Sequence, residues 1–452
     1  MSLLQKVKTR KKHIKLLWGA IESHESELIE ALYLDLNKPE AEALLQEIYP
    51  LKKEYETCLR NIYVWSGKRK VSTPLALMGT SHYVLAEPKG EVLIISPWNF
   101  PVMLTLRPLF GALASGNRVV VKPSEHTPNT SNVIKKLIGS VFDDDTVSVR
   151  LGGPDIAAGL TSEPFDHICF TGGTEIGKLV MKSAAENLCS VTLELGGKSP
   201  VIVDKTAHIC NAALRVAWGK YMNAGQVCIA PDYMLVEKAK QAEMVQALTD
   251  RIVAMFGENP IDSVDLGSIV NARHYNRILG LIKSAVKSGA KLHVPGGVLE
   301  LGAEKLKIAP CILTDCTPDM EIMKEEVFGP VLPVLTWESK DKVLDVISKN
   351  PNPLALYVFS SKSKNINFFT ENTKAGSTAI NEVIIQVANP DMGFGGIGYS
   401  GMGRSNGKAS FDAFSNLRSY VSSSTRFNLL PLTFPPFGKK GLMFSRFIRK
   451  WL

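Results

Sequence analysis

The 452-residue chain has no uninterrupted run approaching 18 apolar residues, so its sequence predicts no conventional membrane-spanning helix. Its seven cysteines are scattered without close pairs, which favours reduced thiols inside a cell over a disulfide scaffold. The 35 glycines and 25 prolines follow no fixed period, and this excludes collagen and simple repeat arrays. Apolar residues make up 45% and charged residues 21%, the composition of a folded globular protein.

Acidic residues are absent from both ends of the chain. Residues 1–21 contain six Lys and Arg, and residues 424–452 contain another six. Removing these twelve from the 52 Lys and Arg leaves 40 against 44 Asp and Glu, so the net charge of +8 sits on the ends. Because nucleic-acid binding prefers a basic face on the folded body, we expect no nucleic-acid partner. The apolar stretch 16–21 is too short for a secretory signal, and we expect a cytoplasmic protein.

Short apolar runs alternate with helical segments along most of the chain. Two amphipathic helical stretches come first, at 12–35 and 40–65. Strands are then predicted at 91–96, 118–122, 147–151, 167–171 and 201–204, with helices between them near 100–115, 125–140, 155–162 and 175–189. A second series has strands at 233–237, 331–335 and 356–359 and helices near 238–256 and 272–288. This alternation predicts parallel sheets in two α/β domains, divided near Gly196.

Three residues are candidates for chemistry. Cys228 follows Asn223-Ala-Gly-Gln-Val, and these loop formers argue against the buried hydrophobe that a free cysteine usually is. Glu194 ends a strand before two glycines, as either a solvated carboxylate or one with room to swing. Asn99 follows a buried strand at the edge where open α/β sheets bind ligands. It is either a turn residue or a donor to a developing oxyanion.

A cysteine–histidine hydrolase is one alternative for Cys228. An ordinary thiol is only a few per cent thiolate at neutral pH, so a catalytic one needs a base or a cationic neighbour. No histidine lies close to Cys228 in the sequence. His167 and His274 stay open as partners brought together by the fold.

The segment Phe170-Thr-Gly-Gly-Thr-Glu-Ile-Gly177 follows a predicted strand and opens a helix. It is similar to a dinucleotide-binding fingerprint, with Thr174 where the second glycine is expected. Such a turn places backbone N–H groups and a helix dipole near a pyrophosphate. Lys122 and Glu125 lie at the end of another predicted strand, either as ribose-binding groups or as a solvated loop pair.

Taken together and in this order, the motifs resemble the aldehyde dehydrogenase superfamily. They are Pro97-Trp-Asn-Phe, Val121-Lys-Pro-Ser-Glu125, Phe170 to Gly177, Glu194-Leu-Gly-Gly-Lys198, Gly225-Gln-Val-Cys228 and Glu326-Val-Phe-Gly-Pro330, and the resemblance spans roughly residues 10–420. Residues 220–233 and 401–411 resemble the class 3, or fatty aldehyde, branch. That branch usually has His where Asn406 and Asn416 stand, and these departures bear on substrate preference.

The resemblance implies an α/β fold of two doubly wound Rossmann-like domains, one cofactor-binding and one catalytic, with a small oligomerisation arm that makes a homodimer. The NAD(P)-binding domain is expected at 1–70 and 89–195, the catalytic domain at 196–403, and the arm at 71–88 and 404–437. Residues 438–452 form a basic amphipathic tail. We expect this tail either to contact a membrane peripherally or to pack on the partner subunit.

The resemblance also implies the chemistry: oxidation of aldehydes, medium- or long-chain aliphatic or aromatic, to carboxylic acids with NAD, or also NADP. Cys228 would form a thiohemiacetal and then a thioester, Glu194 would be the general base, and Asn99 would hold the oxyanion. The cofactor would contact Trp98, Lys122, Glu125, Thr171, Gly172, Gly173, Thr174, Gly177, Glu326 and Phe328, and no metal is expected.

Two other classes of protein stay open on the same fold. One is a non-catalytic binding or structural relative, and the joint presence of Cys228, Glu194 and Asn99 argues against it. The other is a coenzyme-A-acylating dehydrogenase, which needs no base to activate water. Glu194 favours hydrolysis over transfer to coenzyme A.

Overall fold

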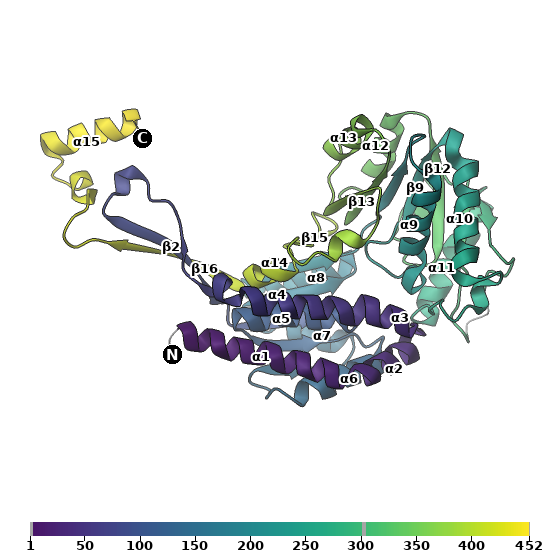
Figure 1. The fold of residues 1–452 in the computed structure, drawn as a ribbon, viewed down its shortest axis with the longest axis horizontal. Helices are drawn as coiled ribbons and strands as arrows, with labels where there is room; N and C mark the ends of the chain where they lie inside the picture. The colour runs from purple at the N-terminus through teal and green to yellow at the C-terminus, as the bar shows by residue number, and fades with distance from the viewer. Residues whose placement is uncertain (1–2, 301–303, 452) are drawn as a thin grey trace.

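The computed structural model describes residues 3–300 and 304–451, which form two α/β bodies and an arm that extends from the first body (Figure 1). The first body contains a six-stranded sheet in the order β15-β7-β6-β3-β4-β5. Its strands are β3 (Glu91–Ile95), β4 (Arg118–Lys122), β5 (Val147–Val149), β6 (His167–Gly172), β7 (Ser190–Leu195) and β15 (Gly401–Met402). All neighbours pair in parallel except β15, which runs antiparallel to β7.

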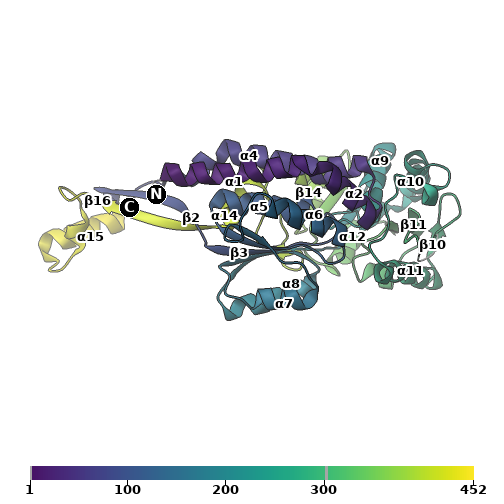
Figure 2. The ribbon, with the colours of Figure 1, turned by 90° about the horizontal axis from the view of Figure 1, so that it is seen from below.

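Helices cover both faces of this sheet. Its crossover helices are α5 (Met103–Ser115), α6 (Pro128–Gly139), α7 (Pro154–Thr161) and α8 (Thr174–Glu186). Figure 2 shows α7 and α8 on one face, and α5 and α6 on the other beneath two long N-terminal helices, α1 (Leu3–Ser23) and α4 (Tyr49–Ser66). The apolar stripe of α1, with Ile14, Leu17 and Ile21 fully buried, packs into this core.

The stretch predicted as one helix over 40–65 contains a π-helix. After α2 (Glu25–Leu36), the short helix α3 (Glu40–Ala43) leads into the π-helix η1 (Leu44–Ile48), and α4 follows directly. A π-helix widens one turn and redirects the side chains that it carries, which hydrophobic periodicity does not reveal.

The second body has a seven-stranded sheet in the order β10-β11-β12-β9-β8-β13-β14. Its strands are β8 (Pro200–Val203), β9 (Tyr233–Glu237), β10 (Lys291–His293), β11 (Cys311–Thr314), β12 (Val331–Trp337), β13 (Ala355–Phe359) and β14 (Ser377–Ile380). The helices are α9 (Ile209–Tyr221), α10 (Gln241–Phe256), α11 (Ala272–Lys287), α12 (Lys340–Ser348) and α13 (Ser363–Glu371). Val201 and Val203 pack in the core with α9 and α10, whereas Ile202 packs in the core with α11. Both faces are therefore covered, as the doubly wound prediction requires.

The arm joins segments that are far apart in the sequence. Strand β2 (Thr80–Pro88) pairs antiparallel with β16 (Ser415–Ser423) along its whole length and with the short β1 (Arg69–Lys70) on its other edge. The hairpin or extended arm predicted at 71–88 thus receives its main partner from the C-terminal region. Helix α14 (Gly407–Ala413) packs on α4 and α5 of the first body, and α15 (Gly438–Trp451) lies at the tip of the arm (Figure 1).

Candidate active site

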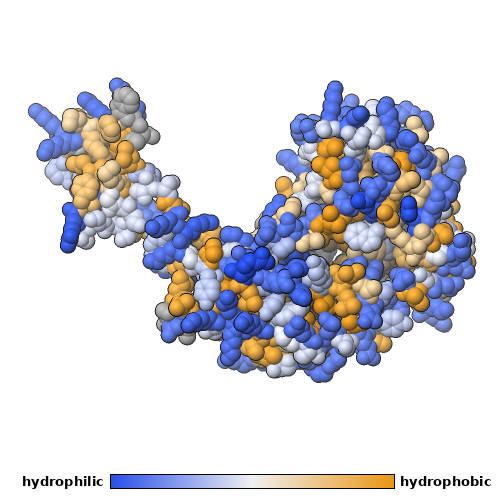
Figure 3. Space-filling view, in the orientation of Figure 1, coloured by the Kyte–Doolittle hydropathy of each residue, from blue (hydrophilic) through white to orange (hydrophobic). Residues whose placement is uncertain are grey.

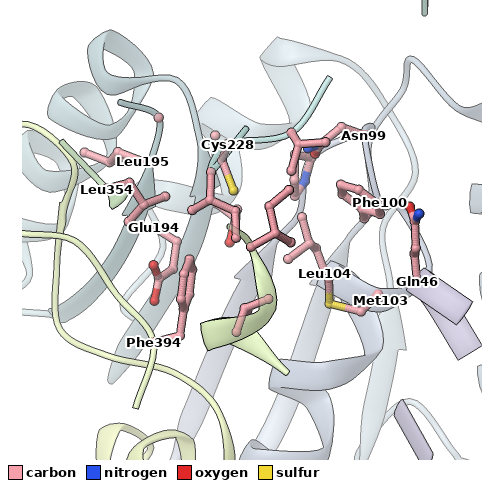
Figure 4. Close-up of a pocket in the computed structure, with 18 of the residues that line it drawn as sticks. Gln46, Asn99, Phe100, Met103, Leu104, Glu194, Leu195, Cys228, Leu354 and Phe394 are labelled. Carbon is pink, nitrogen blue, oxygen red and sulfur yellow. The ribbon is translucent and has the colours of Figure 1, made fainter. Parts of the chain in front are cut away.

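One cavity of about 500 Å³ lies where the carboxyl edge of the first sheet meets the amino edge of the second. Its wall is formed by residues at the carboxyl ends of β3, β6 and β7 and in the loops before β9 and β12, with further polar residues from η1, α5, α11 and the segment that leads into α14. Asn99, Glu194 and Cys228, predicted from separate motifs, all line this cavity (Figure 4). So do six of the ten residues predicted for cofactor binding: Trp98, Thr171, Gly172, Gly173, Glu326 and Phe328. Lys122, Glu125, Thr174 and Gly177 are not in its wall, although they lie at the same edge of the first sheet.

A sharply reversed loop carries Cys228 into the cavity. Asn223, Ala224 and Gly225 have φ values of 48°, 52° and 76°, three left-handed residues in succession between α9 and β9. At Gly225 a Cβ atom would lie 2.2 Å from the carbonyl oxygen of Gly329, so only glycine lets the two backbones approach this closely. The loop is thereby held against the segment that carries Glu326 and Phe328.

The Cys228 side chain is half-buried and lines the cavity. Burial raises the pKa of its thiol to about 12, and the carboxylates of Glu326 and Glu194 add to this shift. The N–H groups of Cys228 itself and of Ile229 favour the thiolate and so oppose the rise in pKa. The thiol is thus protonated at neutral pH and needs a proton acceptor before it can attack a carbonyl.

Neither histidine left open by the sequence is paired with Cys228 among the described contacts. His167 begins β6, at the opposite end of the sheet, where its ring contacts Lys89, Ser190 and Thr192. His274 lines the cavity, but its ring packs on Trp98 with the centroids 5.3 Å apart. Burial lowers the pKa of His274 to about 4, so the ring is neutral.

Glu194 supplies a carboxyl group suited to taking up a proton. Its Oε1 accepts a hydrogen bond of 3.0 Å from the Ser405 hydroxyl, while Oε2 is buried and has no partner among the described residues. Burial raises the pKa of Glu194 to about 8, although Ser405, Arg404 and Arg107 lower it. Ser405 and Arg107 also line the cavity. Sequence reasoning missed both, because nothing in a Gly-rich loop or in the apolar helix α5 marks them.

Asn99 is 2% exposed and is held from several sides. Its side-chain amide donates a hydrogen bond of 3.0 Å to the carbonyl oxygen of Gln226, two residues before Cys228. The backbone carbonyl oxygen of Asn99 accepts hydrogen bonds from the side-chain amide of Asn223 and the ammonium of Lys38. Since a carboxamide nitrogen carries two hydrogens, the second remains for a ligand in the cavity.

The features expected of a dinucleotide site are present on the first body. Helix α8 begins at Thr174 with Gly173 as its N-cap and with no side chain capping its free N–H groups. Lys122 and Glu125 form an ion pair of 2.6 Å. Burial raises the pKa of Glu125, but the hydrogen bond from Lys122, the Glu125 backbone N–H and the charges of Lys122 and His126 together outweigh burial and leave the pKa below its usual value.

Glu326 approaches the backbone of the Gly196-Gly197 turn. A Cβ atom on Gly196 would lie 2.1 Å from Oε2 of Glu326, so a larger residue there would displace the Glu326 carboxylate from this position. Burial and Asp232 raise the pKa of Glu326 to about 8. Trp98 and Phe328 meet edge to face with centroids 5.3 Å apart and form an aromatic wall beside it. These groups suit a sugar and a planar ring, so the residues present fit a nicotinamide dinucleotide.

Asn406 and Asn416, the two departures from the class 3 pattern, have different surroundings. Asn406 lines the cavity and is 3% exposed, and its Nδ2 has no partner in the described part of the chain. Asn416 is exposed on β16, where it pairs with Glu87. Within residues 3–300 and 304–451, no group of three or more His, Cys, Asp or Glu is placed to hold a metal ion.

A family model described as the aldehyde dehydrogenase family matches residues 4–420. The chain belongs to this family. It is an NAD-dependent aldehyde dehydrogenase, as the sequence motifs predicted.

Relatives of this aldehyde dehydrogenase point to the class 3 branch. It is 43% identical to a 4,4'-diaponeurosporen-aldehyde dehydrogenase of Staphylococcus aureus strain NCTC 8325, with 92% of this chain and 90% of that protein covered. It is 38% identical to aldehyde dehydrogenase family 3 member A2 of Macaca fascicularis, over 97% and 89% of the two chains.

Solved structures confirm the predicted fold and cofactor. The substrate-bound state of Staphylococcus aureus AldH superposes with a TM-score of 0.94 at 41% identity, covering 98% of this dehydrogenase and 95% of that chain. A Mycobacterium tuberculosis aldehyde dehydrogenase complexed with NAD+ has a TM-score of 0.83 at 25% identity, over 92% and 85% of the two chains.

Proposed function

We propose that Cys228 is the nucleophile of aldehyde oxidation and that Glu194 is the general base that activates water for hydrolysis of the thioester. Asn99 and the Cys228 N–H bind the carbonyl oxygen. The observation that carries this proposal is the convergence of the three side chains, from segments far apart in the sequence, on one cavity. Each has a suitable chemical state: a thiol, a carboxyl with one unpartnered oxygen, and an amide with a hydrogen to spare.

In the proposed mechanism, the Cys228 thiol first loses its proton to a water molecule in the cavity. The Cys228 sulfur then bonds to the aldehyde carbon, and the carbonyl oxygen becomes an oxyanion that the Asn99 amide and the Cys228 N–H stabilise. NAD, when bound, supplies the acceptor for the hydride that leaves this carbon. The thioester that remains on Cys228 is attacked by water, and Glu194 accepts the proton of that water as the carboxylic acid leaves.

For the cofactor we propose the residues derived from the motifs. The free N–H groups in the first turn of α8, within the Gly172–Gly177 segment, would bind the pyrophosphate. Lys122 and Glu125 would bind one ribose and Glu326 the other, with Trp98, Thr171 and Phe328 beside the nicotinamide. The Glu125 carboxylate would repel a 2′-phosphate, so NAD should be preferred over NADP.

The substrate that we propose is a medium- or long-chain aliphatic or an aromatic aldehyde. A large part of the cavity wall is apolar. It is made by Phe100, Met103, Leu104 and Phe394, which Figure 4 labels, and by Trp218, Met222, Ile384, Ile385 and Val387. Such a wall gains free energy from each methylene group that leaves water, about 0.8 kcal/mol at most. The diaponeurosporen-aldehyde in the name of the Staphylococcus aureus relative is consistent with a large apolar substrate.

The function is tested by following the absorbance of NADH with a series of aldehydes. We expect kcat/KM to rise several-fold for each pair of methylene groups from propanal to decanal, and to be higher with NAD than with NADP. Added coenzyme A should leave the product a free carboxylic acid. A coenzyme A thioester would instead identify an acylating enzyme, and no NADH with any aldehyde would identify a non-catalytic relative.

We further propose that the arm, residues 71–88 and 404–437, joins two copies of the chain in a homodimer. Strands β2 and β16 extend away from the body, and their outward side chains, such as Leu417 and Val421, are exposed in the single chain. An apolar strand surface of this kind is stable in water when it is covered.

We propose that the enzyme is cytoplasmic and that its tail, residues 438–452, contacts a membrane surface peripherally. Among the described residues no helix is long and apolar enough to cross a membrane. Helix α15 instead exposes Leu442, Met443 and Phe447, while Arg446, Arg449 and Lys450 supply positive charge. Figure 3 shows apolar and hydrophilic residues side by side at this tip. Leu452 and the Trp451 side chain, also assigned to the apolar face from sequence, lie outside the described residues.

We expect the protein to sediment with anionic vesicles at about 0.01 M salt and much less at about 1 M, because salt screens the attraction of the tail to the lipid charge. A chain shortened by residues 438–452 should stay in the supernatant and keep its kcat for propanal. Vesicles of neutral lipid are the control. If the full chain ignores anionic vesicles at low salt, the exposed face of α15 is covered by the partner subunit instead.

A further inference from the structure

A fully buried ion pair lies behind the loop that carries Asn99. The ammonium of Lys38 is 2.6 Å from Oε1 of Glu47, and both side chains are 0% exposed. Lys38 also donates a hydrogen bond of 3.2 Å to the backbone carbonyl of Asn99 and lies 4.3 Å from the centroid of the Phe100 ring. One buried cation therefore holds two successive residues of the carbonyl-binding segment.

Glu47 holds the other end of the same segment. Its Oε2 accepts hydrogen bonds from the backbone N–H of Val102 at 3.1 Å and of Met103 at 2.8 Å. These groups open helix α5, whose N-cap Val102 has no capping side chain of its own, so a carboxylate from another segment caps this helix. Glu47 belongs to the π-helix Leu44–Ile48, a local distortion that often marks functional sites.

The segment fixed in this way is tied directly to the nucleophile loop. The side-chain amide of Asn223 donates to the backbone carbonyl oxygen of Asn99 at 2.8 Å and to that of Gln226 at 3.2 Å. The side-chain amide of Asn99 donates to the same Gln226 oxygen at 3.0 Å. Because the bonds join both the backbone and the side chain of Asn99 to this loop, a shift of the Asn99 backbone would also move its side-chain amide. That backbone position is what Lys38 and Glu47 set.

Lys38 and Glu47 do not line the cavity, although Leu45 and Gln46, which precede Glu47 in the π-helix, do. Figure 4 shows Gln46, Phe100 and Met103 on the same side of the cavity as Asn99. An ion pair withdrawn completely from water costs free energy of desolvation, and burial by itself is weak evidence that it stabilises a fold. Its hydrogen bonds, in contrast, all point to residues 99–103.

We propose that the buried Lys38–Glu47 pair positions the Asn99 amide for the carbonyl oxygen of the aldehyde. The two residues touch neither substrate nor cofactor, so they are positioning residues that act through Asn99. The inference rests on the oxyanion role given to Asn99 under the proposed function. A displacement of an oxyanion donor by about 1 Å typically costs on the order of 10²-fold in rate.

The test is a double-mutant cycle between the pair and Asn99, read as the rate of the first burst of NADH with a good aldehyde. We expect Lys38→Met to slow the burst about 10²-fold, with the KM for NAD changed less than about twofold. Asn99→Ala should slow it by ~10²–10³-fold, the usual loss of one oxyanion donor. Adding Lys38→Met to Asn99→Ala should cost almost nothing more, because the group that Lys38 positions is already gone.

Two further variants separate positioning from stability. Removing one partner of a buried pair can unfold a protein, so the neutral double variant Lys38→Met with Glu47→Gln is made alongside; a pair replaced on both sides is better tolerated. It should fold and show the same slow burst. Leu32→Ala, a buried residue of α2 outside the cavity wall, should lower the melting temperature and leave the burst rate unchanged.

The outcomes are distinguishable from failure of the proposed function. An unchanged burst in Asn99→Ala rejects the oxyanion role and with it this inference. If Asn99→Ala slows the burst but Lys38→Met with Glu47→Gln keeps the normal burst rate, the positioning role is rejected and the oxyanion role of Asn99 stands. Fully multiplicative losses in Lys38→Met with Asn99→Ala would show that the pair acts on another part of the site, and would also overturn the inference.

Discussion

Replacing Cys228 by serine is expected to lower kcat by on the order of 10⁴-fold or more, the scale of losing an enzyme nucleophile. A hydroxyl is a far weaker acid than a thiol. The carboxylates of Glu194 and Glu326, which already raise the pKa of Cys228, would oppose an alkoxide at the same place. Serine preserves the shape of the loop, so NAD should bind with nearly unchanged affinity.

The measurements are the steady-state rate of NADH formation and a titration of NAD binding on the same preparation. Cys210→Ser is a matched control, because Cys210 is an exposed thiol on α9 outside the cavity wall. It should keep the full rate. A Cys228→Ser variant that retained a substantial fraction of kcat would show that the nucleophile is another residue.

Glu194→Gln is expected to divide the reaction into its two halves. Glutamine keeps the size of the side chain and the hydrogen bond from Ser405, but it cannot accept a proton from water. One burst of about one NADH per active site should therefore remain, followed by a steady state slower by ~10²–10⁴-fold. A thioester on Cys228, detected as added mass on the intact protein, would accumulate during the slow phase.

The same residue should set the pH profile of turnover. Because burial raises the pKa of Glu194 to about 8, the carboxyl is mostly protonated below this pH and cannot act as a base. The steady-state rate should rise as the pH increases through 8 and then level off, and the Gln variant should lose this rise. Glu186→Gln, an exposed change at the end of α8, is the control and should keep it. If Glu194→Gln turns over at the normal rate, the base is another group.

The pattern of apolar and turn-forming residues along the sequence was enough to predict most of the architecture of this dehydrogenase. The runs at 91–95, 118–122 and 167–172 are strands with most residues buried, and apolar runs bounded by turn formers indicate such strands locally. The short strands β10, β11 and β14 were not predicted. They contain three or four residues each, too few for a period to show, and only their neighbours in the sheet order them.

The motifs also identified which residues meet in the cavity, since residues at the carboxyl edge of one sheet and in the loop before β9 are brought together by the topology. They did not determine the state of those residues. The loop-forming neighbours of Cys228 argued against a fully buried cysteine, and the side chain is half-buried, but its raised pKa could not be predicted because it comes from packing against the core of the second body.

What only the tertiary structure decided is how charges are buried. In the sequence Lys38 lies between the two predicted N-terminal helices and Glu47 within the second, both as ordinary polar residues, and Arg107 is the one cation in an apolar helix. The fold places Lys38 against the Asn99 carbonyl, Glu47 at the start of α5, and Ser405 against Glu194. Local patterns report whether a side chain prefers water, whereas a buried charge is stable only beside a partner that the chain brings from elsewhere. The partner's identity is therefore a property of the folded molecule.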